Sequence, residues 1–359
     1  MNMIFEKRIQ KLQKLAGSAV QGVLITQPEN VHYLCGFTGT EGSLLIAGES
    51  YFFLTDGRYT TQAHEQVRAG TVLTFKDKTK ELARLVKKCG LGTLGFESQH
   101  MTVAQLRDIE RALAGVRLVA RPDAFDALRM VKDAAEIKLL SRAAEIAAAS
   151  LAETLPCIRI GMSEIDVAAE LEYRMRNKGG SGAAFPTIVA SGPRSAMPHG
   201  MASAKPLARG ELLIIDYGVV YEGYCSDETC TFVLGEPTKK QQRIYDTVQK
   251  AHDRALAALA PGKPLKEVDA AARGYIAARG LGRRFSHGTG HGLGLCVHEQ
   301  PIVSTRSKSI AQKGMVVTIE PGVYLPGWGG VRIEDTAVVT ARGCRLLTRT
   351  DKSLQIIGS

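Results

Sequence analysis

Four acidic residues interrupt apolar, strand-like runs in the second half of this 359-residue chain, and they constrain its fold more than any other feature. Asp216 and Asp227 lie in LLIIDYGVVYEGYCSDETCTF, and Glu320 and Glu334 lie in VVTIEPGVYLPGWGGVRIEDTAVV. Each run predicts two strands joined by a turn. A carboxylate on a buried strand is costly unless it is paired or bound to a metal ion, so these acids need a partner of opposite charge.

The first acidic pair is predicted to lie on a hairpin with a two-residue loop at Tyr221 and Glu222, which places Asp216 opposite Asp227. Directly opposed side chains on one face have Cβ atoms about 4.5–5.5 Å apart. Like charges at that distance repel each other unless a cation lies between them. Tyr-Glu is a poor type I′ turn, so a bulge would change this register. Asp216 alone is weak evidence for a site, because an Asp before a Gly is usually only a turn residue.

The second acidic pair repeats the arrangement, with Glu320 and Glu334 opposite each other if the turn is centred on Gly327. Arg332 precedes Glu334 by two residues and therefore shares its face of the strand. A salt bridge from Arg332 to one of the glutamates is as compatible with this segment as a metal site.

Three of the eight histidines, His287, His291 and His298, lie in the glycine-rich run FSHGTGHGLGLCVHE. The glycines disfavour a helix, which excludes the helical H-E-x-x-H zinc motif, and the run lacks the spacing of a phosphate-binding loop. Four carboxylates and one imidazole suit two divalent ions of the Mn²⁺, Co²⁺, Zn²⁺ or Fe²⁺ type. Two such ions can share a bridging hydroxide and polarise a scissile carbonyl, so the residues predict hydrolysis without naming a substrate.

The chain is long enough for two domains, predicted at residues 1–126 and 127–359. The first alternates strand-like runs (GVLIT, SLLIA, YFFLT, TLGF, VRLVA) with helical segments around 78–88 and 102–114, which indicates an α/β domain. The second opens with an alanine-rich helix over 133–155. It also holds two helical segments of equal length, 161–179 and 262–280, each bounded by glycines. This weak repeat predicts two related αβ halves with a site between them.

Composition excludes several classes of protein. The net charge is +10 and the pI near 9.2, but the basic residues are spread over the chain, so nucleic-acid binding is not expected. No apolar run has the 18 residues of a membrane helix, and the start of the chain does not resemble a signal peptide. These two observations predict a cytoplasmic protein. The seven cysteines are an odd number, widely scattered and without C-x-x-C pairs, which predicts reduced thiols.

Together these residues resemble the pita-bread metallopeptidases, specifically the aminopeptidase P and prolidase branch. The resemblance rests on the order Asp, Asp eleven residues later, His, Glu and Glu, and on FPTIVASG, MPHG, HGTGHGLG, VHE, TIEPGVY and GGVRIEDT. In the first domain, ENVHYLCGFTGTEGSLLI and FLTDGRY are similar to the creatinase-type N-terminal domain. The resemblance spans essentially the whole chain. It implies an α/β creatinase-like domain followed by a pita-bread catalytic domain (α+β) with an internal pseudo-twofold αβ repeat.

The resemblance also implies roles for individual residues. Asp227 and Glu334 would bridge two divalent ions, expected to be Mn²⁺. Asp216 would complete one coordination sphere, and His291 and Glu320 the other. The remaining implied roles are proton transfer by Glu320, stabilisation of the tetrahedral intermediate by His298, substrate binding by Phe185, His199, His287, His298 and Tyr324, and orientation of ligands and substrate by Arg332 and Tyr324. His199 is also expected to take part in catalysis, although MPHG is compatible with a simple turn.

The implied activity is hydrolysis of Xaa-Pro bonds at the N-termini of proline-containing peptides by a homodimer. Many archaeal-type prolidases carry an arginine in V-H-E-x-P-R that holds the carboxylate of a dipeptide. Here Ile302 takes that place, so an Xaa-Pro aminopeptidase that accepts longer peptides is expected, although Arg306 is close enough to substitute. The alternatives are a strict Xaa-Pro dipeptidase and a non-enzymatic pita-bread binding module. Intact ligands disfavour the binding module and creatine hydrolysis, and the N-terminal domain and the GGVRIED form disfavour methionine aminopeptidase.

Overall fold

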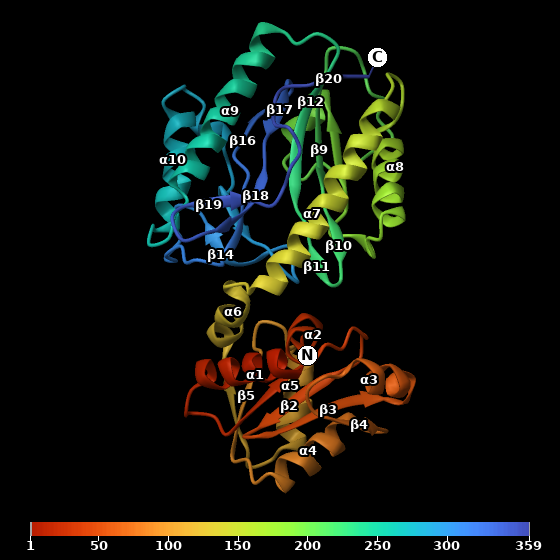
Figure 1. Cartoon of the computed structure of the whole chain (residues 1–359), viewed down its shortest axis with the longest axis vertical. Coiled ribbons are helices and arrows are strands. Elements are labelled where there is room, and N and C mark those ends of the chain that lie inside the picture. Colours follow the sequence, from red (N-terminus) through yellow and green to blue (C-terminus); the bar gives the residue numbers. More distant parts are fainter. Residues whose placement is uncertain (1, 359) are drawn as a thin grey trace. The chain divides into compact units, whose positions relative to one another are not determined.

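The computed structural model describes residues 2–358 and divides into two compact units, Met1–Arg129 and Met130–Ser359 (Figure 1). The sequence placed the domain boundary after residue 126, which lies inside helix α6 (Pro122–Met130). No helix in residues 2–358 is long and apolar enough to cross a membrane.

The first unit is built on a six-stranded sheet with the order β4-β3-β2-β1-β5-β6. Strand β2 is antiparallel to β1 and β3, whereas β1 pairs with β5, β5 with β6 and β3 with β4 in parallel. The apolar runs expected to form strands are all found here. The strands are β1 (Gly22–Ile25), β2 (Ser43–Ala47), β3 (Ser50–Asp56), β4 (Thr71–Phe75), β5 (Thr93–Phe96) and β6 (Arg117–Ala120).

Helices α4 and α5 pack on one face of this sheet. In α4, Leu82, Leu85 and Val86 are spaced three and four residues apart, so they form one apolar stripe that is buried against Leu24 and Leu54. Asp77 caps α4, and Thr102 forms a capping box with Gln105 at the start of α5. The other helices are α1 (Asn2–Ala16), α2 (Pro28–Cys35), α3 (Thr60–Gln66), α4 (Lys78–Lys88) and α5 (Val103–Ala112).

The second unit consists of two halves of similar construction. In one half, α7 (Ala134–Thr154) and α8 (Glu164–Asn177) accompany a sheet of order β20-β12-β9-β8. In the other, α9 (Lys239–Ala258) and α10 (Leu265–Ala277) accompany a sheet of order β14-β13-β15-β18-β19. Figure 1 shows the two helix pairs on opposite sides of the strands. Helices α8 and α10 each begin three residues after a glycine with positive φ, so the internal repeat predicted from the sequence is present.

Short strands connect and complete these two sheets. A three-stranded sheet joins β11, β10 and β7, and a hairpin joins β16 and β17. The strands of the second unit are β7 (Gly182–Ala183), β8 (Ile188–Ser191), β9 (Leu212–Tyr217), β10 (Val219–Tyr221), β11 (Tyr224–Cys225), β12 (Glu228–Leu234), β13 (Gly290–Gly292), β14 (Glu299–Val303), β15 (Val316–Ile319), β16 (Gly322–Leu325), β17 (Gly329–Arg332), β18 (Asp335–Val339), β19 (Cys344–Leu346) and β20 (Ile356–Ile357).

The hairpin that carries the two aspartates differs from the sequence prediction by two residues. Tyr221 pairs with Tyr224, so the loop is Glu222-Gly223 and Asp216 lies opposite Thr229 rather than Asp227. Both loop residues have positive φ, 49° and 83°, which a type I′ turn requires and which the glycine permits. A slip of two residues keeps every side chain on its face of the sheet. Asp216 and Asp227 are therefore diagonal neighbours on one face.

The hairpin that carries the two glutamates has the predicted centre. Gly322 pairs with Arg332 in β16 and β17, and Ile319 pairs with Asp335 in β15 and β18. Both segments are symmetric about Gly327, which has a positive φ of 77°. Glu320 and Glu334 lie between the two paired segments, opposite each other.

Candidate metal centre

A cavity of about 500 Å³ in the second unit gathers most of the residues expected at the site. Tyr324 is not among its lining residues, but it contacts two of them. Ile302 and Met201 also line the cavity and are partly exposed. Arg306 is exposed and is not among the described lining residues. The expected residues that line the cavity are Phe185, His199, Asp216, Asp227, His287, His291, His298, Glu320, Arg332 and Glu334.

Three buried side chains, Asp227, His291 and Glu334, form the centre of this cluster. One ligand atom from each lies within 4.8 Å of the other two. His291 Nε2 is 3.5 Å from Asp227 Oδ2 and 3.7 Å from Glu320 Oε1. His291 Nδ1 lies 3.0 Å from the carbonyl oxygen of Gly292. Because a carbonyl oxygen only accepts hydrogen bonds, Nδ1 carries the ring proton and donates this bond. The lone pair of Nε2 therefore faces the carboxylates and is available to a metal ion.

The electrostatics of the cluster fit a cation. Burial raises the pKa of the Asp227 and Glu334 carboxyls well above their usual range, and neighbouring negative charges raise it further. Burial also raises the pKa of Glu320 to about 8 and lowers that of His291 to about 4, so the imidazole is neutral near pH 7. Among residues 2–358, no group lies within hydrogen-bonding distance of the buried Asp216 Oδ1. Crowded carboxylates with an unused oxygen and a neutral imidazole are a suitable set for divalent ions.

Arg332 forms its salt bridge with an aspartate. The salt bridge to a glutamate, which the sequence offered as an alternative to a metal site, is not formed in the part of the chain that the structure describes. Its Nη2 donates to Asp216 Oδ2 at 2.6 Å, and its Nη1 donates to the Tyr324 hydroxyl at 3.0 Å. Asp216 is reachable because strand β9 lies beside β17 in space. Arg332 thus holds one oxygen of Asp216 and leaves the other free.

A hydrogen-bonded chain continues from Arg332 to His287. The Nδ1 atom of His287 donates to the carbonyl of Gly288 at 2.7 Å, so its Nε2 accepts from the Tyr324 hydroxyl at 2.8 Å. Burial, together with the charge of Arg332, lowers the pKa of His287 to about 4. These hydrogen bonds therefore hold a neutral imidazole at the cavity, with His287 Nδ1 3.9 Å from Glu320 Oε2.

His298 lies against His291. The rings of His291 and His298 meet edge to face with centroids 4.3 Å apart. The next residue, Glu299, forms a buried ion pair of 2.6 Å with Lys132, which anchors the segment that carries His298. His298 thereby borders the cavity from beside the cluster.

Two supporting groups were not identified from the sequence. Thr229 donates to Glu334 at 2.7 Å and accepts from Arg332 Nε at 3.2 Å. Its position two residues after Asp227, on the same strand face, could have identified it. Arg273 forms two hydrogen bonds of 2.8 Å with Asp269 on α10 and donates to the His287 carbonyl at 2.7 Å. The spacing of four residues in a helix could have indicated this pair.

The two-half fold and the buried cluster of acids and imidazole define a metal-dependent hydrolase. The chain belongs to metallopeptidase family M24, whose model matches residues 138–341. Residues 8–131 match the creatinase/prolidase N-terminal domain. The pita-bread fold and the creatinase-like domain implied by the sequence are thus confirmed.

Several relatives cover nearly the whole chain. An Xaa-Pro dipeptidase of Pyrococcus horikoshii is 38% identical over 99% of this chain and 100% of its own length. The structure of an Xaa-Pro dipeptidase from Bacillus anthracis is 39% identical, with a TM-score of 0.95, over 98% of this chain and 100% of its own. That of an X-Pro aminopeptidase from Thermotoga maritima is 37% identical, with a TM-score of 0.90, over 94% of this chain and 98% of its own.

Proposed function

We propose that this chain is an Xaa-Pro dipeptidase, the alternative to the aminopeptidase expected from Ile302. The observation that carries the proposal is the buried cluster of Asp227, His291 and Glu334, present in a chain that aligns over its full length with proteins named Xaa-Pro dipeptidase. The expectation of an aminopeptidase is not confirmed. It keeps one supporting observation, the similarity to the X-Pro aminopeptidase of Thermotoga maritima.

Five side chains would hold two divalent ions: Asp216, Asp227, His291, Glu320 and Glu334. When bound, such ions polarise the scissile carbonyl and lower the pKa of a water molecule. We propose Mn²⁺ because four of the five ligands are carboxylates, which suit hard ions. Metal analysis of the purified protein, with activity measured after reconstitution with Mn²⁺, Co²⁺ or Zn²⁺, tests this choice.

The chain's own residues perform the remaining steps. We assign to Glu320, which borders the proposed ions, the transfer of a proton from the attacking water to the departing proline nitrogen. We assign to His298, which lines the cavity beside His291, a hydrogen bond to the oxygen on which negative charge develops. We assign the binding of the substrate and its proline ring to the lining residues Phe185, His199 and His287, which are oriented in part by Tyr324 and Arg332.

We also propose a cytoplasmic homodimer that acts on proline-containing peptides. All seven cysteines lie within residues 2–358 and are free thiols, as in a reducing compartment. Helix α8 exposes Ile165 and Tyr173, by 49% and 62%, and these side chains would be covered in a dimer. Light scattering of the purified protein measures the assembly state.

The decisive test compares Ala-Pro with Ala-Pro-Ala as substrates of the metal-loaded enzyme. A dipeptidase should show a kcat/KM for Ala-Pro that is at least about tenfold higher. Equal or faster cleavage of Ala-Pro-Ala would show an aminopeptidase instead, and cleavage of neither peptide would contradict both functions.

The Ile302→Arg variant tests the inference that Ile302 stands where other prolidases hold the dipeptide carboxylate with an arginine. A new charge near the dipeptide carboxylate should raise kcat/KM for Ala-Pro more than for Ala-Pro-Ala.

A further inference from the structure

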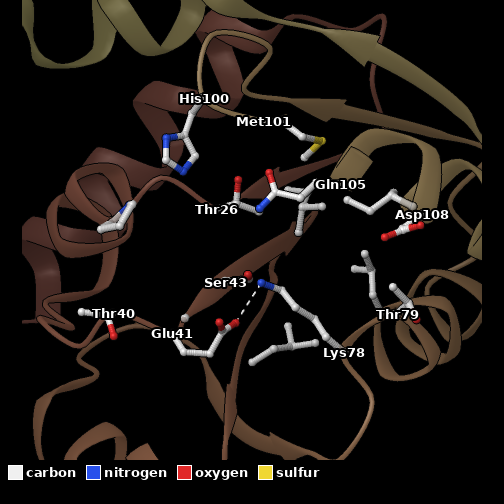
Figure 2. Close-up of a pocket in the computed structure, with 16 residues that line it drawn as sticks. Thr26, Thr40, Glu41, Ser43, Lys78, Thr79, His100, Met101, Gln105 and Asp108 are labelled. Atoms are coloured by element: carbon white, nitrogen blue, oxygen red, sulfur yellow. Dashed lines mark hydrogen bonds and ion pairs between the residues drawn. The ribbon is translucent and has the colours of Figure 1, made fainter. Parts of the chain in front are cut away.

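The first unit has a cavity of its own, of about 390 Å³, lined only by residues between 24 and 109 (Figure 2). This volume lies in the range of small-molecule sites. One wall is aliphatic and comes from the core between the sheet and helices α4 and α5. The lining also includes polar side chains, among them Glu41, Ser43, Lys78 and His100. An apolar lining with a few polar groups is the usual composition of a ligand site.

The cavity lies at the position in the sheet where ligands of open α/β folds bind. From β1 the chain builds β2, β3 and β4 to one side, and then returns to place β5 and β6 on the other. The order of strands therefore switches between β1 and β5. Thr26 follows β1, and His100 and Met101 follow β5, so the cavity is at the carboxyl ends of the strands beside this switch point. Ligands of such sheets bind in that crevice.

Ser43 provides an independent indication of a ligand. It is the first residue of β2, which is antiparallel to β1, so it lies at the same edge of the sheet. Its side chain lines the cavity and only 1% of the residue is exposed. Within the described part of the chain, no group forms a hydrogen bond with its Oγ atom. A buried hydroxyl without a partner is unfavourable, and a polar ligand in the cavity would satisfy it.

The charged groups at the cavity come in both signs. Lys78, the first residue of α4, forms an ion pair of 3.0 Å with Glu41 (Figure 2), and both side chains are partly exposed. Asp108 adds a second acid. Two acids and one lysine disfavour a phosphate or another free anion. They match a ligand that carries one carboxylate and one ammonium group.

We propose that this cavity binds a free aliphatic α-amino acid. The carboxylate of the ligand lies at Lys78 and accepts a hydrogen bond from Ser43, and its ammonium group lies at Glu41. The aliphatic side chain packs against Leu24, Leu54 and Leu82, which line the cavity. The proposal goes beyond the peptidase reaction and does not depend on the length of peptide that the second unit cleaves.

Calorimetric titration of the full-length, metal-loaded protein with L-leucine tests the proposal. The Lys78→Met variant should weaken this binding at least about tenfold, because a charge-assisted hydrogen bond is lost. The matched control is Lys80→Met on the same helix, whose side chain is 85% exposed and does not line the cavity. Leucine can also enter the catalytic cavity as a product-like ligand, so the informative quantity is the difference between these two variants. Both should keep the wild-type kcat/KM for Ala-Pro.

Two further measurements keep the proposal open to refutation. Glu41→Gln should also weaken binding, which provides a second variant should Lys78→Met fold poorly. L-leucinamide and 4-methylpentanoate, which lack the carboxylate and the ammonium group respectively, should each bind more weakly than L-leucine. Equal affinity of the Lys78→Met and Lys80→Met variants overturns the proposal. So does the absence of leucine binding to the wild type, or tighter binding of inorganic phosphate at Lys78.

Discussion

Both units of the molecule bury carboxylates, but they stabilise them in opposite ways. In the first unit, Glu97 is 2% exposed and is surrounded by donors. Its Oε2 accepts from the backbone N–H groups of Thr26 and Gln27 at 2.5 and 2.9 Å, and its Oε1 accepts from Asn30 at 2.6 Å. In the second unit, the carboxylates of the metal cluster face one another, and one oxygen of Asp216 has no partner among the described residues.

This difference separates a structural acid from a functional one. Burial raises the pKa of Glu97, but the donors from Thr26, Asn30 and Gln27 oppose the rise, so the protein itself satisfies the charge. At the cluster, neighbouring charges add to the effect of burial on Asp227 and Glu334. A lone buried acid with its own donors needs nothing from outside, whereas several buried acids that face one another with fewer donors than oxygens favour a cation.

The largest expected effect is on activity when a central ligand is neutralised. Asp227→Asn and Glu334→Gln keep the side-chain volume but remove a negative charge, so kcat/KM should fall more than about 100-fold and metal content should fall with it. Without metal, the same variants should be more stable than the wild type, because a repulsion is removed. Exposed Glu236→Gln is the control. A variant with full activity and normal metal content would show that the acids do not form a metal centre.

The second effect separates catalysis from metal binding. His298→Ala should lower kcat by about 10²–10³-fold, the usual effect of losing a donor to a developing oxyanion. Metal content should stay close to two ions per chain, because His298 borders the cluster without being one of its ligands. Metal analysis beside steady-state kinetics measures both quantities. Loss of metal together with activity would show that His298 is itself a ligand.

The third effect is on stability after metal removal. The pKa of Glu320 is raised to about 8, so the metal-free folded state binds a proton that the unfolded chain releases near pH 4.5. The free energy of unfolding of the chelator-treated protein should therefore fall as the pH rises from about 5 to 8, by a few kcal/mol. Saturating metal should remove most of this dependence. Urea unfolding at several pH values measures it, and a stability that rises with pH in the metal-free protein would contradict the assignment.

The smallest effect concerns Glu97. Glu97→Ala leaves the N–H groups of Thr26 and Gln27 buried without acceptors and should cost about 2–4 kcal/mol of unfolding free energy. Glu97→Gln retains one acceptor oxygen for these groups and should cost less than about 1 kcal/mol. Neither variant should change the kcat of the folded enzyme. If Glu97→Gln reduced activity without loss of stability, the contrast between the two units would not hold.

Local sequence patterns predicted most elements of the fold. Apolar runs bounded by turn residues became β1, β2 and β3, and the alanine-rich segment that Asp133 caps became α7. Strand β4 and helix α3 were not predicted, because both are short and partly exposed and lack a clear apolar period. Tertiary packing rather than local propensity determines such elements.

At the site, the sequence identified residues more reliably than their partners. The register of the glutamate hairpin was predicted correctly from a turn at Gly327. The register predicted for the aspartate hairpin was wrong by two residues, because the turn was placed at Tyr221-Glu222 instead of Glu222-Gly223. The pairing of Arg332 with Asp216 could not be derived from local pattern, because 116 residues separate them. Which acid a buried arginine meets depends on how the two halves pack, and no single segment contains that information.

The separation of these residues along the chain has a consequence for how the protein matures in a cell. Ribosomes add about 5–20 residues per second, so roughly 6–23 s pass between the synthesis of Asp216 and that of Arg332, two residues before Glu334, the last acid of the cluster. During that interval the aspartates exist without the glutamates that complete their surroundings. Metal loading is therefore expected at the end of synthesis, when the ions free in the surrounding fluid, rather than affinity alone, determine which metal the new enzyme acquires.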